Sequence, residues 1–189
     1  LVGSYWAYML EDICYGQASH QANHSYLHHV LASPNLDFFA APFNYWHPAR
    51  HAGEPYLPFQ PYDSLRVNGK LHIPECDNRT FRAAELDRGR NYSREETVSI
   101  VRRDMGTALM HGMGAWFSDW TNNEYPERRK SEPYFLDDQI LNTTASLLDT
   151  YRKTLDLPRG KTQAEIAVFA SGTTQYYHDN NAQPIYSEI

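Results

Sequence analysis

Short apolar runs alternate along the chain with stretches of helical spacing. The runs that predict strands lie at residues 2–10, 36–41, 70–74, 115–120 and 165–170. Apolar residues recur at the three- and four-residue spacing of a helix face in residues 20–32, 93–110 and 135–155. This alternation predicts an α/β fold whose strands form a parallel sheet.

The clearest predicted helix has both a start signal and a buried face. Ser93, followed three residues later by Glu96, forms a capping box, which satisfies backbone donors at the beginning of a helix. The apolar positions on its expected buried face are Val98, Val101, Met105 and Ala108. We therefore expect a helix that begins at Ser93 and ends before residue 111.

Long loops follow the predicted strands, and the longest spans residues 42–69. A long loop inside a compact domain is usually functional. No glycine-rich turn of the dinucleotide-binding or P-loop kind follows any strand, so a nucleotide site is not predicted.

Composition narrows the class of protein. A length of 189 residues is typical of one domain, or of one domain with a fragment of another. The formal net charge of −6 argues against nucleic acid as a partner, because phosphate binding needs a basic surface. Two cysteines, Cys14 and Cys76, are too few for a disulfide framework or a zinc site. Aromatic residues make up 14% of the chain, which suits a sugar-binding cleft and a densely filled core equally well.

The first residues give an expectation about localisation. The chain opens with an apolar run that looks like a strand already under way, without the basic and apolar segments of a signal peptide. No apolar run approaches the ~18 residues of a membrane span. We expect a cytoplasmic location and no membrane partner, and we expect the chain to be a fragment of a larger protein.

Glu75 is the leading candidate for catalysis. It stands at the carboxyl end of the predicted strand 70–74, and Asp77 and Arg79 follow within four residues. A carboxylate beside a guanidinium stays ionised and could act as a nucleophile. A structural Glu–Arg pair at the end of a strand is the alternative.

Aromatic and polar residues lie at the ends of the other predicted strands. The members of this set are Tyr5, Tyr8, Phe43, Asn44, Tyr45, Trp116, Asp119 and Trp120. Because the carboxyl ends of parallel strands meet at one edge, we expect these residues to line one cleft, where the rings could stack on sugars. For each ring, core packing is the alternative.

Histidines recur every four residues at His20, His24 and His28. Pairs with this spacing occur in metal sites, but no acidic residue joins them and the H-E-x-x-H motif is absent. We therefore expect no metal and no cofactor, although a metal-dependent hydrolase remains a third interpretation. His20, at a loop–helix junction, could point into the cleft.

Several stretches resemble the later barrel strands of β-galactosidase-like glycoside hydrolases, and family 42 is the closest likeness. They are residues 19–20, 30–42, 63–64, 68–71, 75–80, 102–106 and 112–119. The resemblance implies half of a (β/α)₈ (TIM) barrel over residues 1–157, with four β–α units that correspond to strands five to eight. Residues 158–189 would be a linker followed by the start of another domain or by a tail.

The resemblance also implies roles for residues. Glu75 matches the nucleophile at the end of the seventh strand of a retaining glycosidase. The acid/base glutamate closes the fourth strand in that family, a position that would precede Leu1. The residues expected to bind the carbohydrate substrate are Tyr5, Tyr8, His20, Phe43, Asn44, Tyr45, Arg79, Trp116, Asp119 and Trp120.

Two further expectations follow from a half-barrel. Its bare inner face and two unpaired edges favour a homodimer in which two copies cover each other. The alternative to a hydrolase is a non-catalytic carbohydrate-binding or structural remnant that self-associates.

Overall fold

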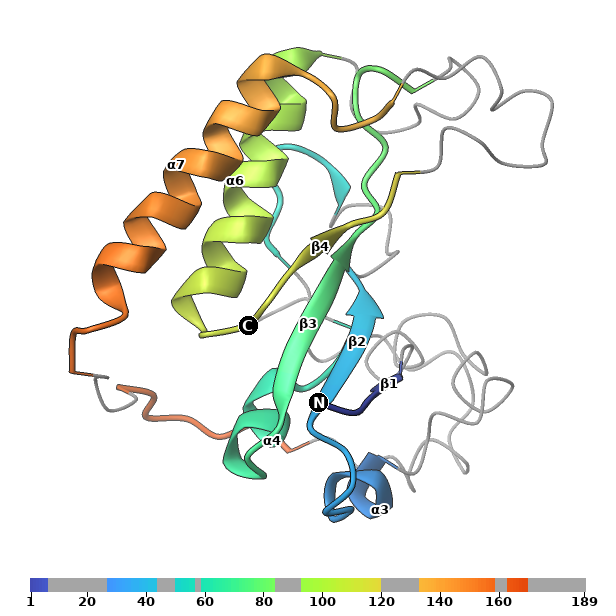
Figure 1. The fold of residues 1–189 in the computed structure, drawn as a ribbon, viewed down its shortest axis with the longest axis vertical. Helices are drawn as coiled ribbons and strands as arrows, with labels where there is room; N and C mark the ends of the chain where they lie inside the picture. Colours follow the sequence, from blue (N-terminus) through green and yellow to red (C-terminus); the bar gives the residue numbers. More distant parts are fainter. Residues whose placement is uncertain are drawn as a thin grey trace, which may run out of the picture.

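A parallel sheet with helices in the connections between its strands forms the framework of the protein (Figure 1). The computed structural model describes residues 1–6, 27–43, 50–56, 59–83, 93–119, 133–158 and 163–169. The elements in chain order are β1 (Gly3–Tyr5), α3 (Leu27–Leu31), β2 (Phe38–Pro42), α4 (Tyr62–Val67), β3 (Leu71–Cys76), α6 (Arg94–Met110), β4 (Trp116–Phe117) and α7 (Asp138–Thr154).

The four strands lie in the order β1-β2-β3-β4, and each neighbouring pair is parallel. The register aligns Tyr5 with Ala40 and Ala40 with Ile73. Further along, Glu75 pairs with Pro42 on one side and Trp116 on the other. The prediction of an α/β fold with a parallel sheet is confirmed.

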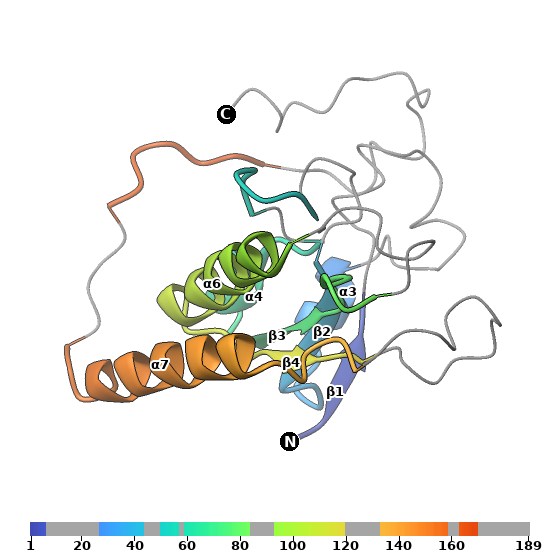
Figure 2. The same cartoon turned by 90° about the horizontal axis from the view of Figure 1, so that it is seen from above.

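The two faces of the sheet differ in what covers them. Phe39, Ala41 and Cys76 point to the helix side and are buried. Two of the residues that alternate with them, Leu71 and Trp116, keep more than a third of their surface exposed. Figure 2 shows α6 and α7 side by side along one side of the sheet. We call the other side, which carries Leu71, Glu75 and Trp116, the open face.

Two apolar clusters form the core on the helix side. The larger joins β3 to α6 and α7 through Cys76, Val98, Met105 and Ile140. The smaller packs Phe39 of β2 and Leu65 of α4 against α3. These clusters pack the helices against one face of the sheet and so fix the positions of the strands.

The two long helices follow the predicted pattern. Ser93 caps α6: its side chain accepts from Glu96 N, and its backbone N donates to the Glu96 side chain. α7 begins at Asp138 instead of at residue 135, because the Asp137 side chain accepts from the backbone N of Gln139 and Ile140. Phe135, just before the helix, packs its ring 4.6 Å from that of Phe117.

Two sequence-based expectations are wrong. Residues 42–69, expected to be a loop, contain the short helix α4. Six residues are too few to show a helical spacing of apolar positions, and the helix is held by Leu65, which is buried in the core. Residues 165–169 form no strand: Ile166 and Phe169 are exposed, and no neighbouring strand is available to pair with them within the described residues. Within those same ranges, no helix is long and apolar enough to cross a membrane.

Candidate active site at the carboxyl end of the sheet

Glu75 lies near the end of β3 and is 6% exposed. Its Oε2 accepts a 2.6 Å hydrogen bond from the hydroxyl of Tyr5. The backbone carbonyl of Glu75 accepts from Phe43 N at 3.3 Å. The carboxylate of this residue is therefore held by β1, and its main chain by the residue that follows β2.

The register explains how Tyr5 reaches Glu75 across an intervening strand. Tyr5 aligns with Ala40 and Ile73, two residues before Glu75, so the two side chains share the open face. The residue between them on β2 is Ala40, whose small side chain leaves room for the phenol ring. The register of β1, β2 and β3 therefore places the Tyr5 hydroxyl beside the Glu75 carboxylate.

Trp116 stands on the other side of Glu75. The two residues are directly paired across β3 and β4, which places their side chains on the same face. Trp116 is 43% exposed and Tyr5 is 47% exposed, so both flank the buried carboxylate while presenting ring surface to solvent. Tyr5, Glu75 and Trp116 form the candidate site.

Other predicted residues take different positions. Phe43 is 3% exposed and packs in the helix-side core, edge-on to Tyr56, so its position does not support a role in sugar stacking. It alternates with Pro42, which faces the open side.

The other predicted residues lie past the ends of β3 and β4 or outside the described part of the chain. Asp119 is exposed beyond β4. Arg79 donates to the backbone carbonyl of Asp77 at 3.0 Å. The remaining predicted site residues, Tyr8, His20, Asn44, Tyr45 and Trp120, lie outside the described residues.

A buried ion pair next to Glu75 in the chain, between Arg50 and Asp77, was not predicted from the sequence. Arg50 Nη2 lies 2.7 Å from Asp77 Oδ1, and the same nitrogen donates to Phe43 O at 2.7 Å. Both charged side chains are almost fully buried. Arg50 therefore connects the end of β2 to the residues that follow β3.

A second buried acid joins α6 to the same loop. Asp104 accepts from Asn78 Nδ2 at 2.8 Å and from Arg103 Nε at 2.6 Å. Burial raises the pKa of Asp104, and the neighbouring Arg103 opposes that rise. Arg103 also donates to the backbone carbonyls of His51 and Glu54, so it fixes the segment that contains Arg50.

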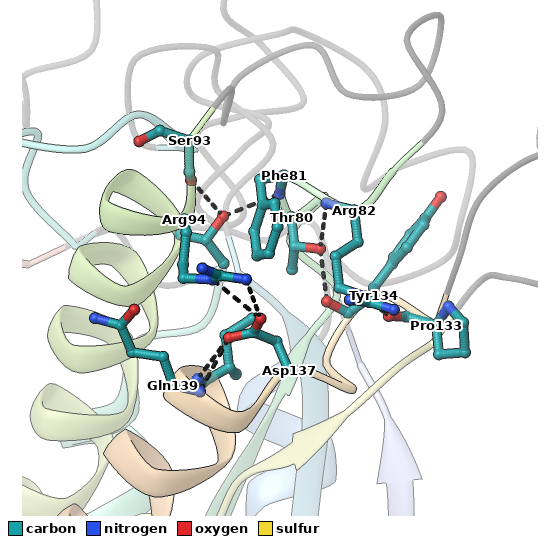
Figure 3. A network of polar contacts seen from close by, with 11 residues as sticks. Thr80, Phe81, Arg82, Ser93, Arg94, Pro133, Tyr134, Asp137 and Gln139 are labelled. Carbon is teal, nitrogen blue, oxygen red and sulfur yellow. Dashed lines mark hydrogen bonds and ion pairs between the residues drawn. The ribbon is translucent and has the colours of Figure 1, made fainter.

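A third set of contacts holds the far side of the loop after β3 (Figure 3). Thr80 Oγ1 donates to Tyr134 O at 2.6 Å, and Arg82 Nε donates to Pro133 O at 2.9 Å. Arg94 of α6 pairs with Asp137 at 3.0 Å. These contacts tie the loop after β3 to the beginning of α6 and to the segment that leads into α7.

His72 and Cys76 are buried on the helix side of β3. Burial lowers the pKa of His72 to about 4. Burial also raises the pKa of the Cys76 thiol, and the nearby Asp104 adds to that rise. A buried thiol that resists ionisation is a poor nucleophile, so Glu75 is the better candidate for covalent chemistry.

One of the missed residues carried a signal in the sequence. Asp104 lies three residues after Val101, on the apolar face of the predicted helix, and a charged residue at such a position indicates a buried partner. Arg50 carried no such signal. It lies in a stretch predicted as a loop, 27 residues before its partner Asp77.

The histidine pattern and the comparisons complete the description. Within the described ranges, no group of three His, Cys, Asp or Glu residues could hold a metal ion. His20 and His24 lie outside those ranges. Comparison of the chain with protein-family models, with curated proteins and with solved structures gave no match.

Proposed function

We propose that the chain supplies the nucleophile, Glu75, of a retaining glycoside hydrolase. In this proposal, β1 to β4 are strands five to eight of a (β/α)₈ barrel. The observation that carries the proposal is the 2.6 Å hydrogen bond from Tyr5 to the Glu75 carboxylate at the carboxyl ends of parallel strands. Active sites of (β/α)₈ barrels lie at this end of the strands.

The surroundings of Glu75 suit nucleophilic attack on a sugar. The Tyr5 hydroxyl orients one carboxylate oxygen and leaves the other available. That oxygen would attack the anomeric carbon, and the leaving group would depart with the electrons of the broken C–O bond. The exposed indole of Trp116, directly beside Glu75, offers an apolar surface for a sugar ring.

Retaining hydrolysis needs a second carboxyl group about 5–5.5 Å from the nucleophile to protonate the leaving oxygen. The resemblance assigns that role to no residue of this chain. The first step can be tested without it, because a leaving group such as 2,4-dinitrophenolate departs without protonation.

The test is covalent trapping with 2,4-dinitrophenyl 2-deoxy-2-fluoro-β-D-galactoside. Intact-mass spectrometry should show the addition of one fluorosugar, and peptide mapping should place it on Glu75. Glu75→Gln should abolish labelling, whereas Glu95→Gln, at an exposed glutamate of α6, should leave it unchanged. Labelling that survives Glu75→Gln would refute the assignment of the nucleophile.

The second candidate function is sugar binding without catalysis, and the exposed Trp116 favours it independently. A sugar stacked on this ring would change tryptophan fluorescence in proportion to occupancy. Saturable fluorescence change with galactosides that is lost in Trp116→Ala, together with no covalent labelling of Glu75, would favour a binding module over a hydrolase.

A further inference from the structure

We infer that Arg50 is a positioning residue for Glu75, an inference that rests on the function proposed above. The hydrogen bond that orients the Glu75 carboxylate comes from Tyr5, whereas Arg50 contacts the residues around Glu75. It contacts the chain at two places next to Glu75: the backbone carbonyl of Phe43 on the neighbouring strand, and the side chain of Asp77 two residues later.

The contacts form a closed ring around the main chain of Glu75. Phe43 N donates to Glu75 O at 3.3 Å, Phe43 O accepts from Arg50 at 2.7 Å, and Arg50 lies 2.7 Å from Asp77. The chain from Asp77 back to Glu75 completes the ring. Any displacement of the end of β3 relative to β2 must therefore break or stretch a contact of Arg50.

The burial of the Arg50–Asp77 ion pair indicates that it fixes the local geometry. The side chains of Arg50 and Asp77 are 5% and 2% exposed, so both charges have left water. Removing two charges from water costs free energy that their attraction only partly offsets, whereas an apolar pair of similar volume is often equally stable. A buried ion pair at this position is therefore better explained by the fixed geometry it imposes than by stability.

The arginine is itself fixed from the helix side. Arg103 donates to the carbonyl of His51, the residue after Arg50, while its Nε contacts Asp104. Asp104 in turn accepts from Asn78, the residue after Asp77. The two residues that follow the ion-paired groups are thus bound to α6, which stabilises the ion pair in one arrangement.

The experiment compares Arg50→Lys with Arg94→Lys in the full chain. Lysine keeps the charge, but its shorter side chain ends in a compact ammonium group that does not reach the position of Arg50 Nη2, the one nitrogen that contacts both Phe43 O and Asp77. Arg94 is the matched control, because it also forms an Arg–Asp ion pair, with Asp137, and makes no contact with β2 or β3 among the described contacts. Circular dichroism confirms that each variant is folded.

Two readouts separate positioning from folding. The first is the ¹³C resonance of the Glu75 carboxyl, assigned by its loss in Glu75→Gln; it should shift in Arg50→Lys and stay in place in Arg94→Lys. The second is the rate of fluorosugar labelling, which should fall roughly tenfold to hundredfold in Arg50→Lys, as expected for a displaced reacting group, and remain at the wild-type value in Arg94→Lys.

If Arg50→Lys does not fold, the double variant Arg50→Gln/Asp77→Asn replaces it, since it removes both charges and leaves no unpaired ion buried. An unchanged Glu75 resonance in a folded Arg50 variant overturns the inference, whatever the labelling result. Absence of labelling in the wild type, combined with a shifted Glu75 resonance in the variant, instead refutes the proposed function and retains the positioning role.

Discussion

The hydroxyl of Tyr5 donates to the carboxylate of Glu75 across 70 residues of chain, at a distance of 2.6 Å. The contact joins β1 to β3 over the intervening β2, so it depends on the register of three strands. An acceptor that is 6% exposed and a donor that is 47% exposed place this hydrogen bond at the boundary between the packed sheet and solvent.

Replacement of this hydroxyl tests its part in the chemistry. Tyr5→Phe removes only the hydroxyl, so the ring should keep its place and the protein should fold. A hydrogen bond to a charged group contributes about 1.5–3 kcal/mol. If the bond orients Glu75 for attack, the labelling rate of the folded variant should fall by roughly 10- to 100-fold, since ~1.4 kcal/mol corresponds to a factor of ten.

The control is Tyr151→Phe on α7, a helix that contributes no residue to the site. It should label at the wild-type rate. Equal rates for Tyr5→Phe and Tyr151→Phe would contradict a role of the Tyr5 hydroxyl in the reaction.

The sequence sufficed for the elements whose signals are local. The capping box at Ser93 and Glu96 specifies the beginning of α6 without help from the rest of the chain. The apolar runs likewise predicted strands at β1, β2, β3 and β4. Helix α4 was missed because six residues carry too little periodicity, and it is Leu65, buried against β2 and α3, that retains it.

The candidate site was only partly predictable. The position of Glu75 at a strand end follows from its sequence, and a parallel sheet brings Trp116 beside it. A position at the end of a strand does not by itself determine which face of the sheet a side chain occupies. Phe43 is one residue past Pro42 and therefore faces the core. The pairing of Arg50 with Asp77 depends on the path of the loop between two strands, and no pattern in the sequence encodes that path.

His72 should make stability depend on pH. Burial lowers its pKa from 6.5 to about 4, and neither ring nitrogen has a hydrogen-bond partner within the described residues. Between these pH values the unfolded chain binds a proton that the folded chain does not, so the free energy of unfolding should fall with decreasing pH. The loss contributed by this group reaches about 3 kcal/mol near pH 4.

The comparison for this prediction uses urea unfolding of His72→Leu at pH 7 and pH 4.5. The variant should lose less stability on acidification than the wild type, because its side chain has no proton to bind. His111→Leu, at an exposed histidine, should retain the wild-type pH dependence. An identical acid-induced loss in the wild type and His72→Leu would show that other groups cause it.

Asp137 should stabilise the beginning of α7. Its carboxylate accepts from two backbone N–H groups and pairs with Arg94. Although desolvation favours the neutral form, the hydrogen bonds from Ile140 and Gln139 and the charge of Arg94 together lower the pKa of Asp137. This contribution is therefore present at neutral pH and is lost as the carboxylate becomes protonated in acid.

Asp137→Ala should lower the free energy of unfolding by about 1–2 kcal/mol, since it removes an N-cap. Asp137→Asn should lose less, because asparagine also caps helices. Asp138→Ala, at the adjacent exposed position, serves as the control and should change stability little. Equal unfolding midpoints in denaturant for Asp137→Ala and Asp138→Ala would contradict the capping role.

The open face of the sheet predicts self-association. Parallel sheets are ordinarily covered on both faces, yet Leu71, Trp116 and Tyr5 remain partly exposed on this one. A second copy related by a twofold axis along the strands could cover the face and pair β1 of each copy with β4 of the other. Leu71→Glu should then weaken association, whereas Val67→Glu, at an exposed position of α4, should not. Sedimentation equilibrium at micromolar concentration measures both variants, and a wild-type chain that stays at its monomer mass of 21.9 kDa would exclude the dimer.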